Sequence, residues 1–305
     1  MKPIICIAGP TASGKSAWAL EIAKTVGGEI INADALQVYS DLQILSARPT
    51  HHEMQDVPHH LFGHVAGDVR YSTGQWLREV QPVVLDCLAR DVVPILTGGT
   101  GLYFKALTEG IAEMPPVSDE AMAKAQGVLD DRGIAALREE AELVDAVATA
   151  RVLGHDPQRL FRIVSVFYET GRALSAWQAN TRPIIPKQFC KRAVLLPERQ
   201  GLYERINNRF GVMVENGGLA EAQAIFAKGY DPSLPMMKAI GLKQFFPYLL
   251  GEVELAESIE LAKRDTRRFA KRQFTWFRGQ ASDWIKIANN AQRRQFEANI
   301  SAKML

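Results

Sequence analysis

The chain has 305 residues, of which 47% are hydrophobic, and a formal net charge of +2. This balance is typical of a soluble globular protein with one large, embellished domain or two domains. No apolar run approaches the roughly 20 residues of a membrane span. Met1-Lys2-Pro3 leads straight into an apolar run, so we expect a cytoplasmic protein without a signal peptide. Three widely spaced cysteines, expected to fill core positions, are Cys6, Cys87 and Cys190.

The first motif is a glycine-rich loop between an apolar run and a helical pattern. The loop reads Gly9-Pro10-Thr11-Ala12-Ser13-Gly14-Lys15-Ser16, after Ile4–Ala8 and before Ala17–Val26. In this context backbone N–H groups converge on phosphate oxygens, and the helix N-terminus adds a positive dipole. Lys15 is expected to reach a terminal phosphate, and the Ser16 hydroxyl to hold Mg²⁺. The loop therefore predicts a phosphorylated ligand without naming it.

Short β-like runs alternate with helical patterns over the first hundred residues. The expected strands are Ile4–Ala8, Glu29–Asn32 and Val92–Leu96, and the expected helices are Ser16–Val26 and Thr73–Ala89. This alternation predicts a parallel, doubly wound sheet.

The alternation of strand-like and helical runs then stops and later resumes. After Met114-Pro115-Pro116, the segment from Asp119 to about Ala179 reads as helices without a strand. Cys190–Leu196 predicts a return strand, and Glu198–Ala227 and Val253–Arg278 are helical patterns. We predict an α/β fold, with a P-loop-containing parallel sheet core flanked by helices and an all-helical insertion domain. The expected boundaries are residues 1–115 for the first part of the core, 116–184 for the insertion and 185–305 for the second part of the core with C-terminal helices.

Two further site elements are expected where the strands end, because ligands of such sheets lie beyond the carboxyl ends of the strands. Asp34 follows the second strand and could be a metal ligand, a general base or a turn residue. The third strand runs into Gly98-Gly99-Thr100-Gly101, which brings the Thr100 hydroxyl towards the ligand. A nucleotide hydrolase normally has an aspartate at the end of a later strand. Threonine and glycines stand there instead, which disfavours ATP hydrolysis.

Charge is unevenly distributed along the chain. Lys263–Arg278 contains seven basic residues and one acidic residue, interleaved with aromatic side chains. This pattern indicates either nucleic-acid binding or an amphipathic helix with solvated charges, which composition alone slightly favours. Val117–Ala150 contains eight acidic and three basic residues, so it is a poor candidate for binding a phosphate backbone.

Five histidines gather between His51 and His64 in a loop-like segment. Neighbouring residues on a loop rarely converge on one tetrahedral site, and no cysteine or glutamate spacing completes a ligand set. Zinc binding by this segment is therefore disfavoured.

Taken together and in order, the motifs resemble the bacterial tRNA dimethylallyltransferase family, also called tRNA isopentenyltransferases. The resemblance spans nearly the whole chain. It rests on Gly9–Ser16, Asn32-Ala33-Asp34-Ala35-Leu36-Gln37-Val38-Tyr39, Pro58-His59-His60-Leu61, Gly98-Gly99-Thr100-Gly101-Leu102-Tyr103, Asp156-Pro157-Gln158-Arg159, Ala239-Ile240-Gly241 and Thr266-Arg267-Arg268-Phe269-Ala270-Lys271-Arg272-Gln273-Phe274-Thr275-Trp276.

The resemblance implies transfer of a dimethylallyl group from dimethylallyl diphosphate to N6 of the adenosine 3′-adjacent to the anticodon in tRNA. Diphosphate is released, Mg²⁺ is the cofactor, and the family suggests a monomer. Asp34 resembles the family's general base, Thr100 the residue that hydrogen-bonds the diphosphate near the breaking bond, and Arg209 the arginine that steadies the diphosphate. ATP is expected to act at most as a competitor for the loop.

The resemblance also implies tRNA contacts, with the insertion gripping the anticodon stem. Two departures from the family pattern are Leu45-Ser46-Ala47-Arg48-Pro49, where relatives usually read Gly-Thr-Ala-Lys-Pro, and Met122, where some relatives carry a basic residue. The matching tRNA-binding positions are Asp34, Ala35, Leu36, Gln37, Thr100, Gln158, Arg159, Leu160, Phe161, Arg162, Lys238, Ala239, Ile240, Gly241, Leu242 and Lys243.

Two other functions use the same loop. A small-molecule kinase could use Asp34 as the base for a substrate hydroxyl, and a nucleotide-switched RNA-binding protein would perform no chemistry. The helical insertion and the basic, aromatic C-terminal region argue against a compact kinase. A switch protein needs a base-specificity motif and water-positioning residues, and we find neither.

Overall fold

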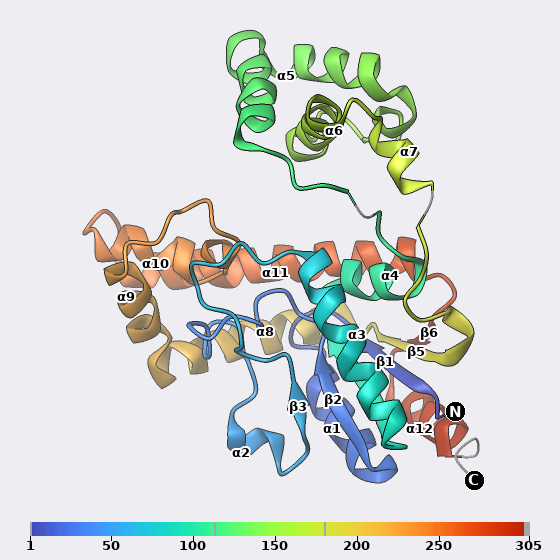
Figure 1. Cartoon of the computed structure of the whole chain (residues 1–305). Helices are drawn as coiled ribbons and strands as arrows, with labels where there is room; N and C mark the ends of the chain where they lie inside the picture. The colour runs from blue at the N-terminus through green and yellow to red at the C-terminus, as the bar shows by residue number, and fades with distance from the viewer. Residues whose placement is uncertain (1, 113, 180, 302–305) are drawn as a thin grey trace. The chain divides into compact units, whose positions relative to one another are not determined.

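The computed structural model describes residues 2–112, 114–179 and 181–301, so Met1 lies outside the described residues. The described strands form one parallel sheet in the order β3-β2-β4-β1-β5-β6 (Figure 1). Their bounds are β1 Ile4–Ala8, β2 Gly28–Asn32, β3 His59–His60, β4 Val93–Gly98, β5 Cys190–Leu195 and β6 Ile285–Ile287.

The central strands are buried along their whole length because helices cover both faces of the sheet. In the register, Ile5 of β1 lies between Ile95 of β4 and Lys191 of β5. Uninterrupted apolar runs, rather than alternating ones, are expected of such strands. One side of the sheet packs on Trp18 and Ile22. The sheet therefore fixes the positions of the loops at its carboxyl edge.

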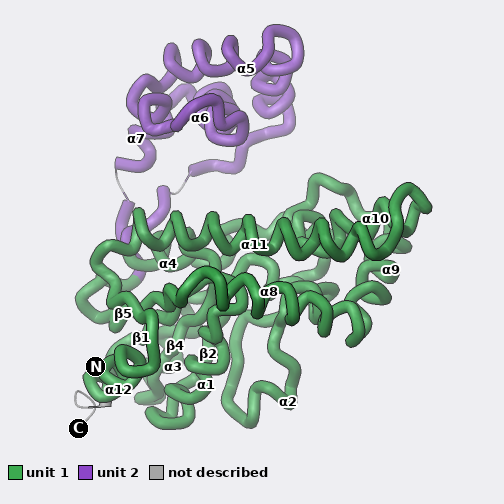
Figure 2. The backbone as a smooth tube through the Cα atoms, turned by 180° about the vertical axis from the view of Figure 1, so that it is seen from behind, with its two compact units in different colours: residues 1–108, 185–305 green, residues 109–184 purple. Residues whose placement is uncertain are grey.

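Helices of the sheet-containing unit flank these strands. The long helix α11 runs beside α8 and α10 (Figures 1 and 2). Their bounds are α1 Lys15–Val26, α2 His51–Met54, α3 Thr73–Ala89, α4 Gly101–Glu109, α8 Arg199–Met213, α9 Leu219–Ala227, α10 Leu242–Leu249, α11 Leu255–Gln280 and α12 Asn290–Ser301. No helix among the described residues is both long enough and apolar enough to cross a bilayer.

The chain divides into two compact units, residues 1–108 with 185–305, and residues 109–184 (Figure 2). The second unit contains α5 Asp119–Thr149, α6 Pro157–Thr170 and α7 Leu174–Gln178, which pack on Leu137 and Leu160. The predicted fold class is confirmed, including the helical insertion. The expected start of the insertion is residue 116, whereas the compact unit begins at residue 109.

Some predicted elements differ in detail. The helical pattern Glu198–Ala227 is two helices, because the segment Val214–Gly218 forms a π-type turn in which Gly217 has a φ of 98°. The loop expected at residues 51–64 instead contains α2 and β3. Strands as short as β3 and β6 leave no periodic signal in a sequence. The three cysteines are buried and free, as predicted.

The histidine segment contributes one residue to a polar cluster. His60 Nε2 lies 2.7 Å from Glu29 Oε2, and Cys87 Sγ lies 3.5 Å from the same oxygen. The sequence spacing completes no ligand set with these histidines, but it could not show that β2 and α3 bring Glu29 and Cys87 beside His60 from distant positions. Arg90 nevertheless donates to both oxygens of Glu29, at 2.7 and 2.8 Å, and this ion pair already satisfies the carboxylate.

Glu29 predicts a pH-dependent contribution to stability. Hydrogen bonds from Arg90, reinforced by His60, lower the pKa of Glu29 from 4.5 to about 2 although burial opposes the shift. The lowered pKa stabilises the fold above about pH 4.5, and that contribution is lost as the pH falls from 4.5 to 2. We expect Glu29→Gln to lower the free energy of unfolding at pH 7. The difference in unfolding free energy between wild type and the variant, which we call the gap, should shrink below pH 4.5.

Urea unfolding between pH 7 and pH 2.5 measures this gap. Glu252→Gln, at an exposed position without an ion pair among the described residues, is the control. A gap that stays constant down to pH 2.5 would contradict the assignment.

Candidate active site

The loop Gly9–Ser16 joins β1 to α1 and leaves the N-terminus of the helix open to an anion. Gly14 precedes α1 with a φ of 85°, a conformation that glycine adopts without strain. No side chain caps the helix, and its first turn has no acidic residue. Its first N–H groups therefore remain available to an anion. Among the described residues the buried Ser13 Oγ has no hydrogen-bond partner, so the loop has a further polar group to offer a ligand.

Gln273 of α11 ties this loop to the turn that follows β4. Its Oε1 accepts from the Thr11 N–H at 2.9 Å, and its Nε2 donates to the Gly99 carbonyl at 3.0 Å. The side chain is only 6% exposed, so both hydrogen bonds are shielded from water. Gln273 thus fixes the spacing between the two loops that form the site, a role that the sequence analysis did not assign to it.

Two arginines of α8 contact the same loop. Arg209 donates to the Thr11 hydroxyl, and Arg205 Nε donates to the Ala12 carbonyl at 3.1 Å. Arg209 is half-buried, which lowers the pKa of its guanidinium. The structure therefore places Arg209 beside the phosphate-binding loop, about two hundred residues away in sequence.

Asp34 is held by a tight turn at the end of β2. The fully buried Asn32 accepts from the Asp34 N–H at 2.8 Å and donates to the Asp34 carbonyl at 3.0 Å. Asp34 Oδ1 accepts from the Leu36 N–H at 3.0 Å. Its other oxygen, Oδ2, accepts no hydrogen bond from the described part of the chain. The turn thus presents one carboxylate oxygen that is available to a ligand.

The turn after β4 lies directly against the turn after β2. A Cβ atom on Gly98 would lie 2.0 Å from the Ala33 carbonyl oxygen, so only glycine permits this approach. Thr100 then bridges the two turns: its N–H donates to Ala33 at 3.2 Å and its hydroxyl accepts from the Ala35 N–H at 2.9 Å. The hydroxyl of Thr100 keeps its own proton for donation to a ligand.

These elements surround a pocket of about 90 Å³. It brings together the phosphate-binding loop, the end of β2, α8 and α11, as expected for a single ligand site. Thr100 is not one of its lining residues. Those residues are Thr11, Lys15, Ser16, Asp34, Leu36, Gln37, Leu45, Ser46, Ala47, Ile206, Arg209, Phe210, Met213, Ile240, Thr266 and Phe269.

The pocket concentrates positive charge around one carboxylate. Burial lowers the pKa of Lys15 from 10.5 to about 8, Asp34 opposes this shift, and Arg209 adds to it by repulsion. Both cations are therefore held where water solvates them poorly. A multiply charged anion would relieve their repulsion, which makes the pocket suited to a diphosphate.

A loop at residues 43–47 closes one side of the pocket. The Glu221 carboxylate accepts from the three backbone N–H groups of residues 43–45 at 2.8, 2.8 and 2.9 Å. Gln37 Nε2 donates to the Ser46 and Ala47 carbonyls at 3.0 and 2.9 Å. These bonds fix the backbone at Leu45, the position where the expected family pattern has a glycine. No pattern in the sequence pointed to Glu221.

The expected tRNA-binding residues lie in both units. Gln158–Arg162 belong to the first turns of α6, where Arg159 and Arg162 are exposed and Arg159 lies 3.4 Å from Asp156. Lys238–Lys243 connect a short 3-10 helix, Pro235–Lys238, to α10. Within that segment Ile240 lines the pocket.

Comparisons with known proteins agree over almost the whole chain. A family model described as IPP transferase matches residues 37–280, and one described as isopentenyl transferase matches residues 2–61. A tRNA dimethylallyltransferase from Maricaulis maris (strain MCS10) is 50% identical over 94% of this chain and 93% of its own length.

Solved structures show the same likeness. The full-length tRNA isopentenylpyrophosphate transferase from Bacillus halodurans has a TM-score of 0.72 and 29% identity, and the match covers 100% of this chain and 97% of that one. A eukaryotic dimethylallyltransferase acting on tRNA has a TM-score of 0.78 and 27% identity, covering 91% of this chain and 70% of that one.

The pKa of Lys15 predicts how anion affinity depends on pH. Lys15 is protonated below about pH 8 and loses its charge above it, so binding of a diphosphate weakens as the pH rises. We expect the Kd of a short alkyl diphosphate to rise by up to about tenfold per pH unit above this value. Calorimetric titration between pH 7 and pH 9.5 measures the Kd. Lys15→Arg stays charged over this pH range and should therefore remove the pH dependence of the Kd. A wild-type Kd that does not change with pH would contradict the prediction.

Proposed function

The chain belongs to the IPP transferase family, and we propose that it transfers a dimethylallyl group from dimethylallyl diphosphate to N6 of the adenosine 3′-adjacent to the anticodon in tRNA. Diphosphate is the second product. The observation that carries this proposal is one pocket that holds a carboxylate with a free oxygen, on Asp34, beside the cations Lys15 and Arg209. Transferases, not kinases, are the named relatives, and Thr97 and Gly98 end the strand where an NTPase has an aspartate.

The diphosphate is the leaving group, so its binding site must stabilise charge that develops as the C–O bond breaks. The N-terminus of α1, Lys15 and Arg209 all offer donors to phosphate oxygens. These donors are fixed before the ligand arrives, because Gln273 and Arg205 hold the loop. Preorganised donors lower the barrier without a cost for reorganising them during the reaction.

Mg²⁺ fits the donors that this pocket offers. The Ser16 hydroxyl lines the pocket beside Lys15 and makes no hydrogen bond to the described residues. Hydroxyl and phosphate oxygens are the ligands that Mg²⁺ prefers. Ser16 would hold the ion together with oxygens of the diphosphate. The bound ion would supply further neutralisation of the leaving group.

Asp34 acts as the general base on the nucleophile. The N6 amine of adenine is a poor nucleophile because its lone pair is delocalised into the ring. As N6 bonds to C1 of the dimethylallyl group, the C1–O bond breaks and its electron pair leaves with the diphosphate. Asp34 Oδ2 accepts the N6 proton, while Asn32 fixes the backbone of Asp34 and the Leu36 N–H holds the carboxylate through Oδ1.

The adenine must leave the anticodon-loop stack to reach this pocket. Extruding a base costs a few kcal/mol and is least costly in a loop. The residues proposed to receive it are Asp34–Gln37, with Thr100 holding the turn and donating to the diphosphate near the breaking bond. The insertion unit grips the stem through the exposed residues of α6. A reaction on tRNA fits a cytoplasmic location, and a monomer suffices because one chain supplies the whole pocket.

Labelled dimethylallyl diphosphate tests the function and the base together. Wild-type protein with Mg²⁺ and bulk tRNA should transfer the label to tRNA, and it should consume the diphosphate only when tRNA is present. Asp34→Asn keeps the size and most hydrogen bonds of the side chain but cannot accept the proton. We expect its single-turnover rate to fall by roughly 10²–10⁴-fold at saturating substrates.

The outcomes separate the alternatives. Rapid ATP turnover by wild type without prenyl transfer would refute the function in favour of a kinase. If Asp34 mainly held Mg²⁺, Asp34→Asn would lose diphosphate affinity and regain part of its rate at higher Mg²⁺. A wild-type rate in the variant would show that Asp34 is not the base.

The insertion unit predicts a separable effect on tRNA binding. Arg159→Ala with Arg162→Ala removes two exposed charges from α6. We expect weaker tRNA binding and a slope of log affinity against log salt that is lower by about one unit for each lost phosphate contact. Affinity for dimethylallyl diphosphate should not change. Arg132→Ala, an exposed arginine of α5, is the control. Wild-type affinity and slope in the double variant would remove α6 from the interface.

A further inference from the structure

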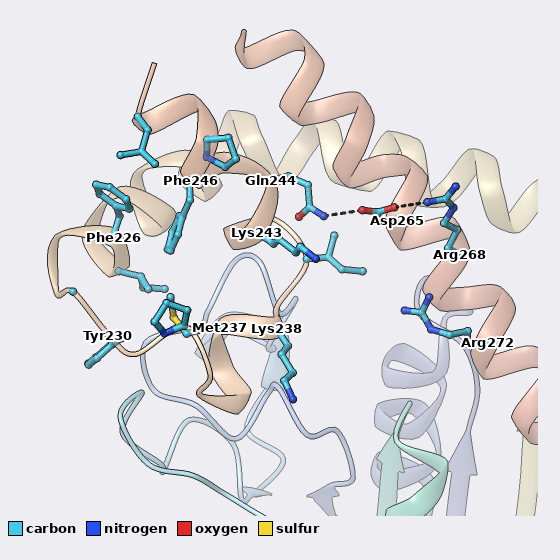
Figure 3. A pocket seen from close by; sticks show the side chains of 16 residues that line it. Phe226, Tyr230, Met237, Lys238, Lys243, Gln244, Phe246, Asp265, Arg268 and Arg272 are labelled. Carbon is cyan, nitrogen blue, oxygen red and sulfur yellow. Dashed lines mark hydrogen bonds and ion pairs between the residues drawn. The ribbon is translucent and has the colours of Figure 1, made fainter. Parts of the chain in front are cut away.

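Two further hollows adjoin the pocket that contains Asp34. The larger one, of about 840 Å³, lies between α9, α10 and α11 (Figure 3). It includes Lys238 and Lys243, which are already among the proposed tRNA contacts. The smaller one, of about 260 Å³, lies beside the start of α1, and Ser16 is the only one of its lining residues with a role in the mechanism above. The smaller hollow is therefore the one that the proposed function leaves unexplained.

This smaller hollow opens onto the proposed diphosphate site. Ser16 and Ala47 line both it and the pocket that contains Asp34. Its apolar walls include Leu20 of α1 and Ile30 of β2, and Thr97 of β4 adds a hydroxyl. We call it the Ser16 chamber. Whatever binds to the Ser16 hydroxyl can reach the chamber without leaving the active site.

Thr97 brings an unpartnered hydroxyl to this chamber. It lies between Ile7 of β1 and Asn32 of β2 in the sheet, and it is only 4% exposed. Its Oγ1 is buried and has no hydrogen-bond partner among the described residues. A buried hydroxyl without a partner is costly to the fold. A ligand that offers Thr97 a hydrogen bond therefore gains binding energy from it.

The position of Thr97 matches its proposed partner. An NTPase has at this strand end the aspartate that helps to hold Mg²⁺. Thr97 shares a face of the sheet with Ile95, and α1 covers that face through Trp18. The Ser16 hydroxyl at the start of α1 and the Thr97 hydroxyl thus line one chamber. Mg²⁺ keeps several of its waters when it binds to proteins, and such waters donate hydrogen bonds to nearby oxygens.

The other polar groups of the chamber are neutral or already engaged. His59 donates through Nδ1 to the Val57 carbonyl at 2.7 Å, and burial lowers the pKa of this imidazole below 6.5, so it is neutral at pH 7. Glu53 is the acidic lining residue, and its Oε2 accepts from the N–H and the hydroxyl of Thr50 at 2.8 and 2.9 Å. The chamber therefore offers oxygen and nitrogen acceptors to a hydrated cation, but little negative charge.

We propose that Thr97 is a positioning residue for Mg²⁺, and that its hydroxyl accepts a hydrogen bond from a water of the ion's hydration shell while Ser16 and the diphosphate bind the ion directly. This inference rests on the proposed function, because that function supplies the diphosphate. Lys15 and Arg209 repel a bare cation, and a neutral hydroxyl cannot offset that repulsion as an aspartate would. Thr97 thus strengthens Mg²⁺ binding only together with the diphosphate, so that both can leave together after the reaction.

Thr97→Val tests this role, because valine keeps the shape of threonine and removes only the hydroxyl. We measure the Kd of inorganic diphosphate by calorimetric titration, once with Mg²⁺ and once with EDTA. Without Mg²⁺ the variant should bind as wild type does. With Mg²⁺ its Kd should be about two- to tenfold higher than that of wild type, the contribution of one hydrogen bond. Free diphosphate binds Mg²⁺ equally in both titrations, so the comparison reports on the protein alone.

Urea unfolding supplies a readout that a merely structural role would move in the opposite direction. Removing an unpartnered hydroxyl should leave the free energy of unfolding of Thr97→Val equal to that of wild type or higher. Thr149→Val is the matched control, because Thr149 in the insertion unit is fully buried and its Oγ1 also has no partner among the described residues. It should match Thr97→Val in stability and wild type in the effect of Mg²⁺.

The outcomes separate this proposal from the proposed function. An equal effect of Mg²⁺ on wild type and Thr97→Val overturns the proposal. A loss of affinity that is the same with and without Mg²⁺ also overturns it, since the hydroxyl would then act on the loop or the diphosphate. A lower free energy of unfolding for Thr97→Val would show that the hydroxyl has a structural partner, with the same consequence. These titrations contain neither tRNA nor a prenyl donor, whereas absence of prenyl transfer by wild type refutes the function.

Discussion

The site depends on confining two cations, Lys15 and Arg209, around one anion-binding loop. Burial makes both costly to hold charged, and Arg209 adds repulsion at Lys15, as the lowered pKa values of Lys15 and Arg209 indicate. The fold tolerates this cost because Asp34 lies in the same pocket and because the loop is fixed by hydrogen bonds that do not involve the ligand. In the proposed function, a diphosphate in the pocket would interact with both cations and with the N-terminus of α1.

Long-range hydrogen bonds supply the rigidity. Gln273 spans from the phosphate-binding loop to the turn after β4, and Thr100 spans from that turn to the one after β2. Three loops that follow three different strands therefore move as one body. The bond from Gln273 to Gly99 is buried and the other two are partly buried, so displacing one loop would leave polar groups of the site without partners. Gln273, which does not line the pocket, thereby helps to set the spacing of the loops that form it.

A phosphate-binding loop can serve different reactions, depending on which residues surround it. A phosphate-binding loop usually accompanies an aspartate that orients Mg²⁺ and water for phosphoryl transfer. Here β4 ends in Thr97 and Gly98, and the carboxylate comes from the end of β2 instead. The loop can then hold a diphosphate as a leaving group while the carboxylate faces a nucleophile. The relatives are named as transferases, which agrees with a carboxylate at the end of β2 instead of β4.

Local patterns determined much of the fold. The strands Ile4–Ala8 and Cys190–Leu195 are continuous apolar runs, and the loop Gly9–Ser16 is a contiguous motif, so each was visible in the sequence. The motifs that carry the family resemblance are equally local. The π-type turn at Val214–Gly218 was missed because its neighbours keep a helical pattern on both sides, and β3 and β6 are too short to show a period.

Only the tertiary structure decided which side chains meet. Gln273 reaches Thr11, Glu221 caps the backbone of residues 43–45, and His60 meets Glu29 beside Arg90, each across many residues of sequence. Periodicity and motif spacing report which face of an element is apolar, but they carry no information about its distant partner. The residues proposed to bind phosphate and to accept a proton were therefore identified from the sequence itself. Their common pocket exists only because the sheet, α8 and α11 bring those segments together.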